Sequence, residues 1–406
     1  MTTSAAAADS TLDRRNMPDL ALREDERWPF YADDEIEAVA EVLRSGRVNQ
    51  WTGDTVFAFE RAFRERFGGG RGIALANGSV ALELPLRAFG IGPGDEVVVT
   101  PRTFVASAFC VRLVGATPVF ADVDPQSGNL TAESIEAVLT ERTRAIIPVH
   151  LAGWPCDMPA IMALAESHGL RVIEDCAQAH GAEVGGRRVG DYGHAAAFSF
   201  CQDKIITTGG EGGYTSFGDE AEWEWAWSFK DHGKSWKKVN EKPVRPGFRW
   251  LHDRVGTNWR LTGPQAAIGL AQVAKMDRWT AARTANAAIW TDALSRVPGL
   301  VAPLPAEGAK HAFYKFYCYL EERPDAARLR DEIVARAVEE GLRVFSGSCS
   351  EVYLERAFDD LPRPELAVAK SLGERSLMVE VHPTLRPDLT RLRAETLANI
   401  AEHVLG

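Results

Sequence analysis

The chain has 406 residues, of which 45% are hydrophobic and 25% charged, so it can form a large globular domain and a second, smaller one. Its net charge of −11 argues against a general nucleic-acid-binding surface, because such surfaces are basic. No apolar run approaches the roughly 20 residues that a membrane span requires, so we expect no membrane partner.

The six cysteines occur singly, and none forms a CxxC pair. We therefore expect no zinc site, no redox motif and no bound metal, and reduced thiols in a cytoplasmic protein are the simplest interpretation. Asp and Arg occur early in the chain, where a signal peptide would have its apolar stretch. We interpret residues 1–25 as a mobile leader.

The pattern of apolar residues predicts two amphipathic helices first, at 34–46 and in the second half of 47–68. Strands and helices then alternate, which predicts an α/β fold with a mostly parallel, helix-covered sheet. Ligands of such sheets bind at the C-terminal ends of the strands. The predicted strands are 72–76, 96–101, 118–122, 145–150, 172–175, 195–200 and 214–217, and the predicted helices are 80–89, 104–114, 132–139, 159–168 and 220–230.

The second half of the chain begins with residues 234–256, here called the basic loop, which have no clear period. One long helix is then expected from about 265 to 297, bridging to a smaller C-terminal α/β domain. We predict a large domain at 26–274, whose N-terminal part could pack on the small domain, and the small domain at 275–406.

The most informative stretch is 171–213, where one apolar run ends at Asp175 and a second is followed by Lys204 and a glycine-rich turn. A reactive lysine must be desolvated or converted to an imine, and an acid at a strand end can pair with a protonated ring nitrogen. Pyridoxal 5'-phosphate (PLP) requires these two groups. On spacing alone, however, such a pair is more often solvated surface charge.

The segment EDCAQAHGAEVGGRRVGDYG, followed by FSFCQDKIITTGGEGG, closely resembles the DegT/DnrJ/EryC1/StrS family of sugar aminotransferases. The resemblance extends over roughly residues 27–400. It implies the aspartate-aminotransferase-like fold type I of PLP-dependent transferases, with PLP as the cofactor.

The resemblance also assigns roles to single positions. It implies that Lys204 is the catalytic lysine that forms a Schiff base with PLP, and that Asp175 binds the pyridine nitrogen. Phe104 matches an aromatic residue that stacks on the ring, and Gln178 matches a residue near the ring's phenolic oxygen. The complete set of implied cofactor-binding residues is Gly78, Ser79, Val80, Phe104, Asp175, Gln178, Ser199, Lys204 and Asn258.

The cofactor phosphate is expected where a strand meets a helix after residue 76, because amides at a helix N-terminus favour a dianion. The resemblance places Ser79, the Val80 amide and Ser199 on this phosphate, although Ser and Asn are also common helix caps. Asn258 matches an asparagine that reaches the PLP phosphate of a partner subunit, which implies a homodimer with shared sites.

Substrate contacts are expected at Trp51, Arg260 and His382. Trp51 and His382 match family segments near the mouth of the site, and Arg260 could bind a donor carboxylate, bind a sugar phosphate, or form an interface salt bridge. The basic loop either binds a substrate diphosphate, with Trp236 or Trp250 stacking on a base, or is solvated surface.

We predict that the protein moves an amino group from L-glutamate, or glutamine, to a keto-sugar, most simply a nucleotide-linked keto-deoxysugar. Residues 345–349 depart from a segment that many nucleotide-sugar members share, so a non-nucleotide ketosugar or a cyclitol of antibiotic biosynthesis stays open. A PLP dehydratase of the same fold is disfavoured, because family dehydratases have histidine where this chain has Lys204. A non-catalytic PLP-binding protein is the remaining alternative.

Overall fold

The computed structural model describes residues 20–242 and 247–406. Within these residues, seven strands form the central sheet: β1 (Arg71–Leu75), β2 (Glu96–Val99), β3 (Thr117–Phe120), β4 (Thr143–Ile147), β5 (Arg171–Asp175), β8 (Ala195–Ser199) and β9 (Gly213–Phe217). They lie in the order β1-β9-β8-β5-β4-β2-β3. From β3 to β8 the neighbours are parallel, and β9 is antiparallel to β8 and β1. The predicted α/β class with a mostly parallel sheet is therefore confirmed.

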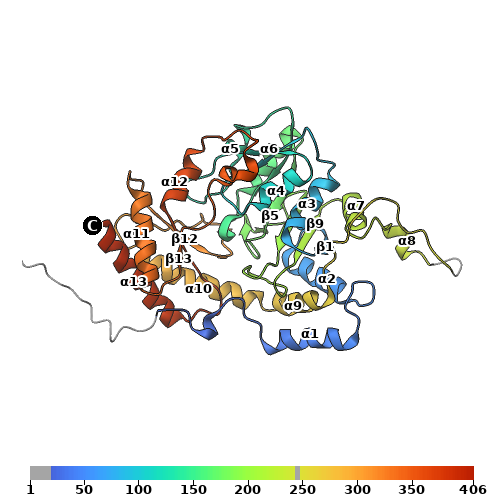
Figure 1. Ribbon diagram of the computed structural model, residues 1–406, viewed down its shortest axis with the longest axis horizontal. Helices are drawn as coiled ribbons and strands as arrows, with labels where there is room; N and C mark the ends of the chain where they lie inside the picture. The colour runs from blue at the N-terminus through green and yellow to red at the C-terminus, as the bar shows by residue number, and fades with distance from the viewer. Residues whose placement is uncertain (1–19, 243–246) are drawn as a thin grey trace, which may run out of the picture.

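Helices cover both faces of this sheet, as Figure 1 shows. The strand side chains alternate between the faces: Ile73 and Leu75 pack in one core cluster, and Ala74 packs in another. The helices in this part of the chain are α1 (Asp33–Ser45), α2 (Thr55–Phe67), α3 (Gly78–Ala88), α4 (Ala106–Leu113), α5 (Ala132–Glu136), α6 (Met158–His168), α7 (Glu220–Lys230), α8 (Trp236–Asn240) and α9 (Gly263–Val273).

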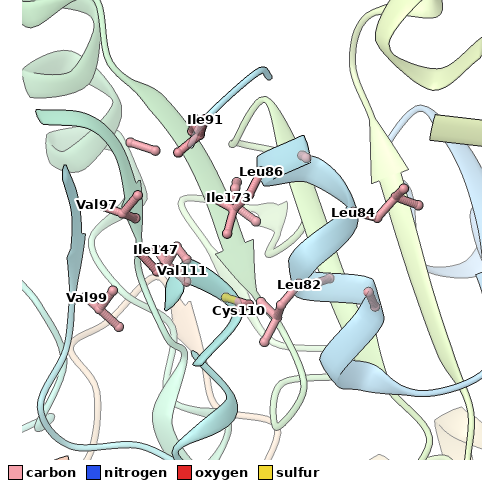
Figure 2. Packing of buried hydrophobic residues seen from close by; sticks show 14 of the residues in the cluster. Leu82, Leu84, Leu86, Ile91, Val97, Val99, Cys110, Val111, Ile147 and Ile173 are labelled. Carbon is pink, nitrogen blue, oxygen red and sulfur yellow. The ribbon is translucent and has the colours of Figure 1, made fainter. Parts of the chain in front are cut away.

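The core under α3 fixes the strand ends that carry the candidate site. Leu86 of α3 lies toward Ile173 of β5 and Leu82 lies toward Cys110 of α4, with Val97 of β2 and Ile147 of β4 in the same cluster (Figure 2). These side chains are almost completely buried. Burying a large aliphatic side chain contributes roughly 1.5–3 kcal/mol, so this cluster holds α3 firmly against the sheet.

A second sheet lies toward the C-terminus and is antiparallel throughout. Its strands follow the order β10-β12-β14-β13. They are β10 (Leu300–Val301), β12 (Phe316–Leu320), β13 (Val344–Phe345) and β14 (Ser376–Val379), and the nearby helices are α10 (Met276–Leu294), α11 (Ala326–Glu339), α12 (Ala367–Arg375) and α13 (Pro387–Leu405). A small third sheet joins β11 (Ala309–Lys310), β6 (Glu183–Val184) and β7 (Arg187–Arg188). The domain boundary near residue 275 stays a prediction.

The single helix expected from about 265 to 297 is instead two helices, α9 and α10, which are separated at Ala274 and Lys275. Lys275 binds Asp34 and Glu35 of α1, each at 2.7 Å. The break lets α9 pack on α1 and α2 while α10 packs on α13. A periodic apolar pattern continues through such a bend, so the sequence did not reveal it.

Residues 1–19 of the expected leader lie outside the described residues. The rest of that segment, 20–25, is held against α13 because Arg393 donates to the carbonyl oxygens of Leu20 and Ala21. Arg393 also forms two hydrogen bonds with the buried Glu26, at 2.8 and 2.7 Å. This part of the chain therefore belongs to the folded structure, in contrast to the expected mobile leader.

Within the described ranges, no helix combines the length and the apolar character needed to span a membrane. All six cysteines lie in these ranges and are free thiols.

Candidate active site

A pocket of about 600 Å³ opens at the C-terminal ends of β1, β2, β5 and β8, the edge of the sheet where a ligand was expected. Each of the four strands delivers a polar or aromatic group there. The predicted residues that line the pocket are Gly78, Ser79, Val80, Phe104, Asp175, Gln178, Ser199 and Lys204. Asn258 is not among the described residues of this lining.

Lys204 lies after β8 with its side chain 14% exposed to solvent. Its Nζ is 3.4 Å from the Tyr314 hydroxyl and 3.8 Å from Oδ1 of Asp203. Burial opposes ionisation of Asp203, but Lys204 and the Tyr314 hydroxyl together lower its pKa. The backbone of Lys204 is held from behind, because the Trp28 indole N–H donates to its carbonyl oxygen at 2.9 Å. The amine thus reaches the pocket from a fixed segment.

Asp175 ends β5 and is 3% exposed. Burial raises the pKa of its carboxyl group, and hydrogen bonds from the Ser107 hydroxyl and the Ala177 amide oppose that shift, as does the charge of Lys204. The two donors lie 2.8 Å from Oδ2 and 3.1 Å from Oδ1. The structure therefore presents a buried acid with fixed orientation in the pocket that Lys204 also lines.

Gln178 is held in one orientation by the backbone. Its Oε1 accepts from the Ala152 amide at 2.7 Å. Because a backbone N–H can only donate, the side-chain oxygen is identified, and the NH₂ group remains as a donor for a ligand in the pocket. The role expected for Gln178 near the ring's phenolic oxygen stays a prediction.

The N-terminus of α3, where the cofactor phosphate was expected, lines the pocket, and one expected contact changes there. Asn77 caps the helix by accepting from the Val80 amide at 3.1 Å. That amide was expected to bind phosphate, and in this structure its proton is already donated to Asn77. Ser79 and Ser199 remain in the pocket lining, and a Cβ at Gly78 would lie 2.6 Å from Cβ of Ser199.

Phe104 lines the pocket but is 67% exposed, so one side of its ring faces solvent in the single chain. The sequence analysis also missed Thr103 and Ser107, which line the pocket, and Tyr314, whose hydroxyl contacts Lys204. The first two follow β2 in sequence and were detectable as polar groups at a strand end. Tyr314 is 110 residues from Lys204, and nothing in the local sequence connects them.

The structure brings Trp51, Arg260 and Asn258 together at a second place, around the buried Asp231. The Trp51 indole N–H donates to Oδ2 of Asp231 at 3.0 Å, and Arg260 Nη1 donates to Oδ1 at 2.6 Å. Asn258 forms a backbone bridge with Asp231 and is itself exposed. We call these four residues the Asp231 cluster. None of them is among the described residues that line the pocket of the same chain.

His382 is also not among the described residues of the pocket lining. It is 3% exposed, stacks on Trp28 at a centroid distance of 6.1 Å, and interacts with the Thr384 hydroxyl at 2.9 Å. Burial lowers its pKa well below the usual value, so it is neutral. It packs on the indole that holds Lys204, and its expected substrate contact stays a prediction.

Part of the expected basic loop is ordered as α8, which projects to the right in Figure 1. Trp236 packs edge-on against Trp223 and Trp227, so it is not free to stack on a base. Trp250 is 80% exposed and packs against Phe248. Arg245 lies outside the described residues.

His150, Glu174 and Cys176 are close enough for a metal, but the donor atoms of His150 and Glu174 are already hydrogen-bonded within the protein. His150 Nδ1 accepts from the Cys156 amide, so Nε2 carries the proton and donates to Glu174 at 3.2 Å. The Glu174 carboxylate also accepts from three backbone amides, those of Gly190, Tyr192 and Gly193. This cluster fixes the strand end next to Asp175.

A profile of the DegT/DnrJ/EryC1/StrS aminotransferase family matches residues 30–395. The chain is 34% identical to the pleiotropic regulatory protein of Geobacillus stearothermophilus (96% of this chain, 99% of that protein) and 37% identical to the GDP-perosamine synthase of Caulobacter vibrioides (84% and 89%). The crystal structure of an aminotransferase from Psychrobacter cryohalolentis superposes with a TM-score of 0.91 at 49% identity, covering 94% of this chain and 99% of that one. With this coverage and the pocket described above, the chain belongs to the DegT/DnrJ/EryC1/StrS aminotransferase family.

Proposed function

We propose that this PLP-dependent aminotransferase moves the amino group of L-glutamate, or glutamine, to a nucleotide-linked keto-deoxysugar. One observation carries the proposal: the Lys204 amine, the buried Asp175 carboxylate and the N-terminus of α3 line a single pocket. These are an amine for the aldehyde, an acid for the ring nitrogen and a phosphate site.

The pocket residues fit PLP in chemistry. Glycine at position 78 leaves the approach to Ser199 open, since a Cβ there would lie 2.8 Å from the Ser199 hydroxyl oxygen. Ser79 and Ser199 would hold the phosphate, and Asp175 would hold the proton of the ring nitrogen. Gln178 would donate to the ring's phenolic oxygen, and Phe104 would cover the ring. These site assignments stay proposals.

When bound, PLP supplies a ring that takes up the electrons of a bond broken at the donor's α-carbon. Lys204 would hold the cofactor through Nζ, and its amine, once released, would carry the proton to and from the donor's α-carbon. The Tyr314 hydroxyl and Asp203 lie beside Nζ and hold it near the pocket while it is free. In the complete reaction, the amino group of the donor is replaced by a carbonyl oxygen, and the carbonyl oxygen of the acceptor is replaced by an amino group.

The acceptor is proposed from the relatives and from one local difference. The Caulobacter relative is named for a GDP-linked amino sugar, which favours a nucleotide-linked acceptor. Residues 345–349, which depart from the family segment, keep a non-nucleotide ketosugar or a cyclitol as the second candidate. The Geobacillus relative is named a regulatory protein, but the complete set of Lys204, Asp175, Gln178 and Ser199 favours catalysis here.

We also propose a homodimer with shared sites. Phe104 is largely exposed beside the pocket, and Trp51, Asn258 and Arg260 of the Asp231 cluster are not among the described residues that line the pocket of their own chain. A second copy would let this cluster complete the partner's pocket. A cytoplasmic location, predicted from the single cysteines, stays a prediction.

The proposed function is tested with purified protein, PLP and L-glutamate, offered either a nucleotide-linked keto-deoxysugar or a free cyclitol ketone. The measurement is the aminated product by mass spectrometry together with the 2-oxoglutarate released. We expect the nucleotide-linked sugar to be aminated faster. Preference for the cyclitol would reject the first acceptor in favour of the second, and Lys204→Ala is the control without the reactive amine.

A further inference from the structure

Asp175 is supported by a chain of two buried hydroxyl groups. Its Oδ2 lies 2.8 Å from Oγ of Ser107, which lies 3.0 Å from Oγ1 of Thr103. All three side chains are at most 3% exposed. Ser107 lies in the first turn of α4 (Ala106–Leu113), and Thr103 lies in the segment that connects β2 to this helix.

The direction of the hydrogen bonds follows from the acid. An ionised carboxylate carries no proton, so Ser107 donates to Asp175. Its single hydroxyl proton is then used, so Thr103 must donate to Ser107. With the Ala177 amide on Oδ1, both carboxylate oxygens have one fixed partner, and the plane of the group is set.

We propose that Ser107 is a positioning residue for Asp175, holding its carboxylate ionised and aimed into the pocket, with Thr103 orienting the Ser107 hydroxyl. The inference rests on the proposed function, because it concerns the acid assigned to the cofactor ring. No backbone group replaces Ser107 on Oδ2 among the described contacts of Asp175.

The surroundings show why this support matters. Burial raises the pKa of Asp175, and Ser107 is the first of the groups that lower it, before the Ala177 amide and the charges of Lys204 and His150. The remaining titratable groups that respond to Asp175 are thiols, which burial keeps neutral by raising their pKa values well above the usual range; they are Cys110, Cys156 and Cys176. Without Ser107, the carboxyl group would take up a proton at higher pH and lose its attraction for a protonated ring nitrogen.

The test follows Asp175 in the protein without cofactor, by ¹³C NMR of labelled aspartate carboxyl groups, with the signal assigned through Asp175→Asn. Ser107→Ala should shift the titration midpoint of Asp175 upward by roughly one pH unit, the value expected for one hydrogen bond to a charged group. Ser107→Thr should restore it, and Thr103→Val should give a smaller shift in the same direction. The same Ser107→Ala protein should bind PLP about tenfold more weakly.

Ser216→Ala is the matched control, because Ser216 is 1% exposed and its hydroxyl has no hydrogen-bond partner in the described structure. It should leave the Asp175 midpoint and PLP affinity unchanged. An unchanged midpoint in Thr103→Val and in folded Ser107→Ala would overturn the inference, as would a shifted midpoint with unaltered PLP affinity. If the wild-type protein binds PLP but does not transfer amino groups, the proposed function fails while both readouts still decide the role of Ser107.

Discussion

Hydrogen bonds of single backbone amides determine which groups in the pocket are free to bind a ligand. The Asn77 side chain accepts the hydrogen bond of the Val80 amide as a helix cap. The expected phosphate site therefore has one free backbone donor fewer than the family pattern implies. The Ala152 amide orients Gln178 and leaves its NH₂ group for a ligand, whereas Asp175 is oriented by the Ala177 amide and the Ser107 hydroxyl together. The sequence predicted both residues. It could not predict their orientation, because the Ala152 amide and the Ser107 hydroxyl that set it come from distant parts of the chain.

Gly78→Ala tests the space at the phosphate end of the pocket. The added Cβ would lie 2.6 Å from Cβ of Ser199, so Ser199 or α3 must move. We expect a loss of roughly 1–3 kcal/mol in the free energy of unfolding, as for other overpacked sites, together with weaker PLP binding in a titration. Gly92→Ala is the control, because its Cβ would come no closer than 3.6 Å to Val114 O. Equal PLP affinity in the two variants would contradict the tight contact.

At the scale of elements, the strand–helix alternation was predictable because each strand and helix carries its own apolar period. Thr131 and Gly169 mark the ends of α5 and α6 as expected from capping chemistry. The break between α9 and α10 was not predictable, since it depends on the contact of Lys275 with α1. The contact between residues 20–26 and α13 was not predictable either, because Arg393 bonds residues that are far away in the sequence.

That contact is tested by Arg393→Ala. Arg393 is 5% exposed and Glu26 is fully buried, so the substitution leaves an unpaired buried carboxylate. Removing one partner of such a pair typically costs about 3–5 kcal/mol, which urea unfolding should report as a lower free energy of unfolding. Arg391→Ala, at an exposed position of α13, should have little effect. A similar loss of unfolding free energy in both variants would show that the Arg393–Glu26 pair does not stabilise the fold specifically.

The same pair predicts a dependence on pH. Burial opposes ionisation of Glu26, but hydrogen bonds from Arg393 and from the Arg386 and Arg23 amides lower its pKa from 4.5 to about 2. Its contribution to stability is therefore complete above pH 4.5 and is lost as the pH falls toward 2. The stability difference between wild type and Glu26→Gln should shrink over this interval. A difference that stays constant on acidification would contradict the assignment.

At the scale of the whole molecule, the Asp231 cluster and the pocket lie at different places in the chain's fold, although the sequence analysis assigned the residues of both to cofactor or substrate binding. The resemblance predicted for Asn258 alone that it contributes to a partner's site, and in the structure Trp51 and Arg260 lie in the same cluster. No property of one chain's sequence says which surface meets a second copy, so the dimer needs an experiment.

Subunit mixing provides that experiment. Lys204→Ala removes the reactive amine, and Asn258→Asp places a negative charge where the proposed dimer brings Asn258 to the partner's phosphate. A mixed dimer of the two variants has one intact pocket, so random mixing of two inactive proteins should restore about a quarter of the wild-type sites, as closed two-fold symmetry requires. Activity that does not rise after subunit exchange would contradict shared sites.

The most direct test of the central claim is to locate the cofactor on the chain. The protein loaded with PLP is reduced with borohydride, digested, and analysed by mass spectrometry for the modified peptide. The account predicts one cofactor-modified lysine, Lys204, whose modification disappears when L-glutamate is added before reduction. Stable modification of a different lysine, with Lys204 unmodified, would contradict it.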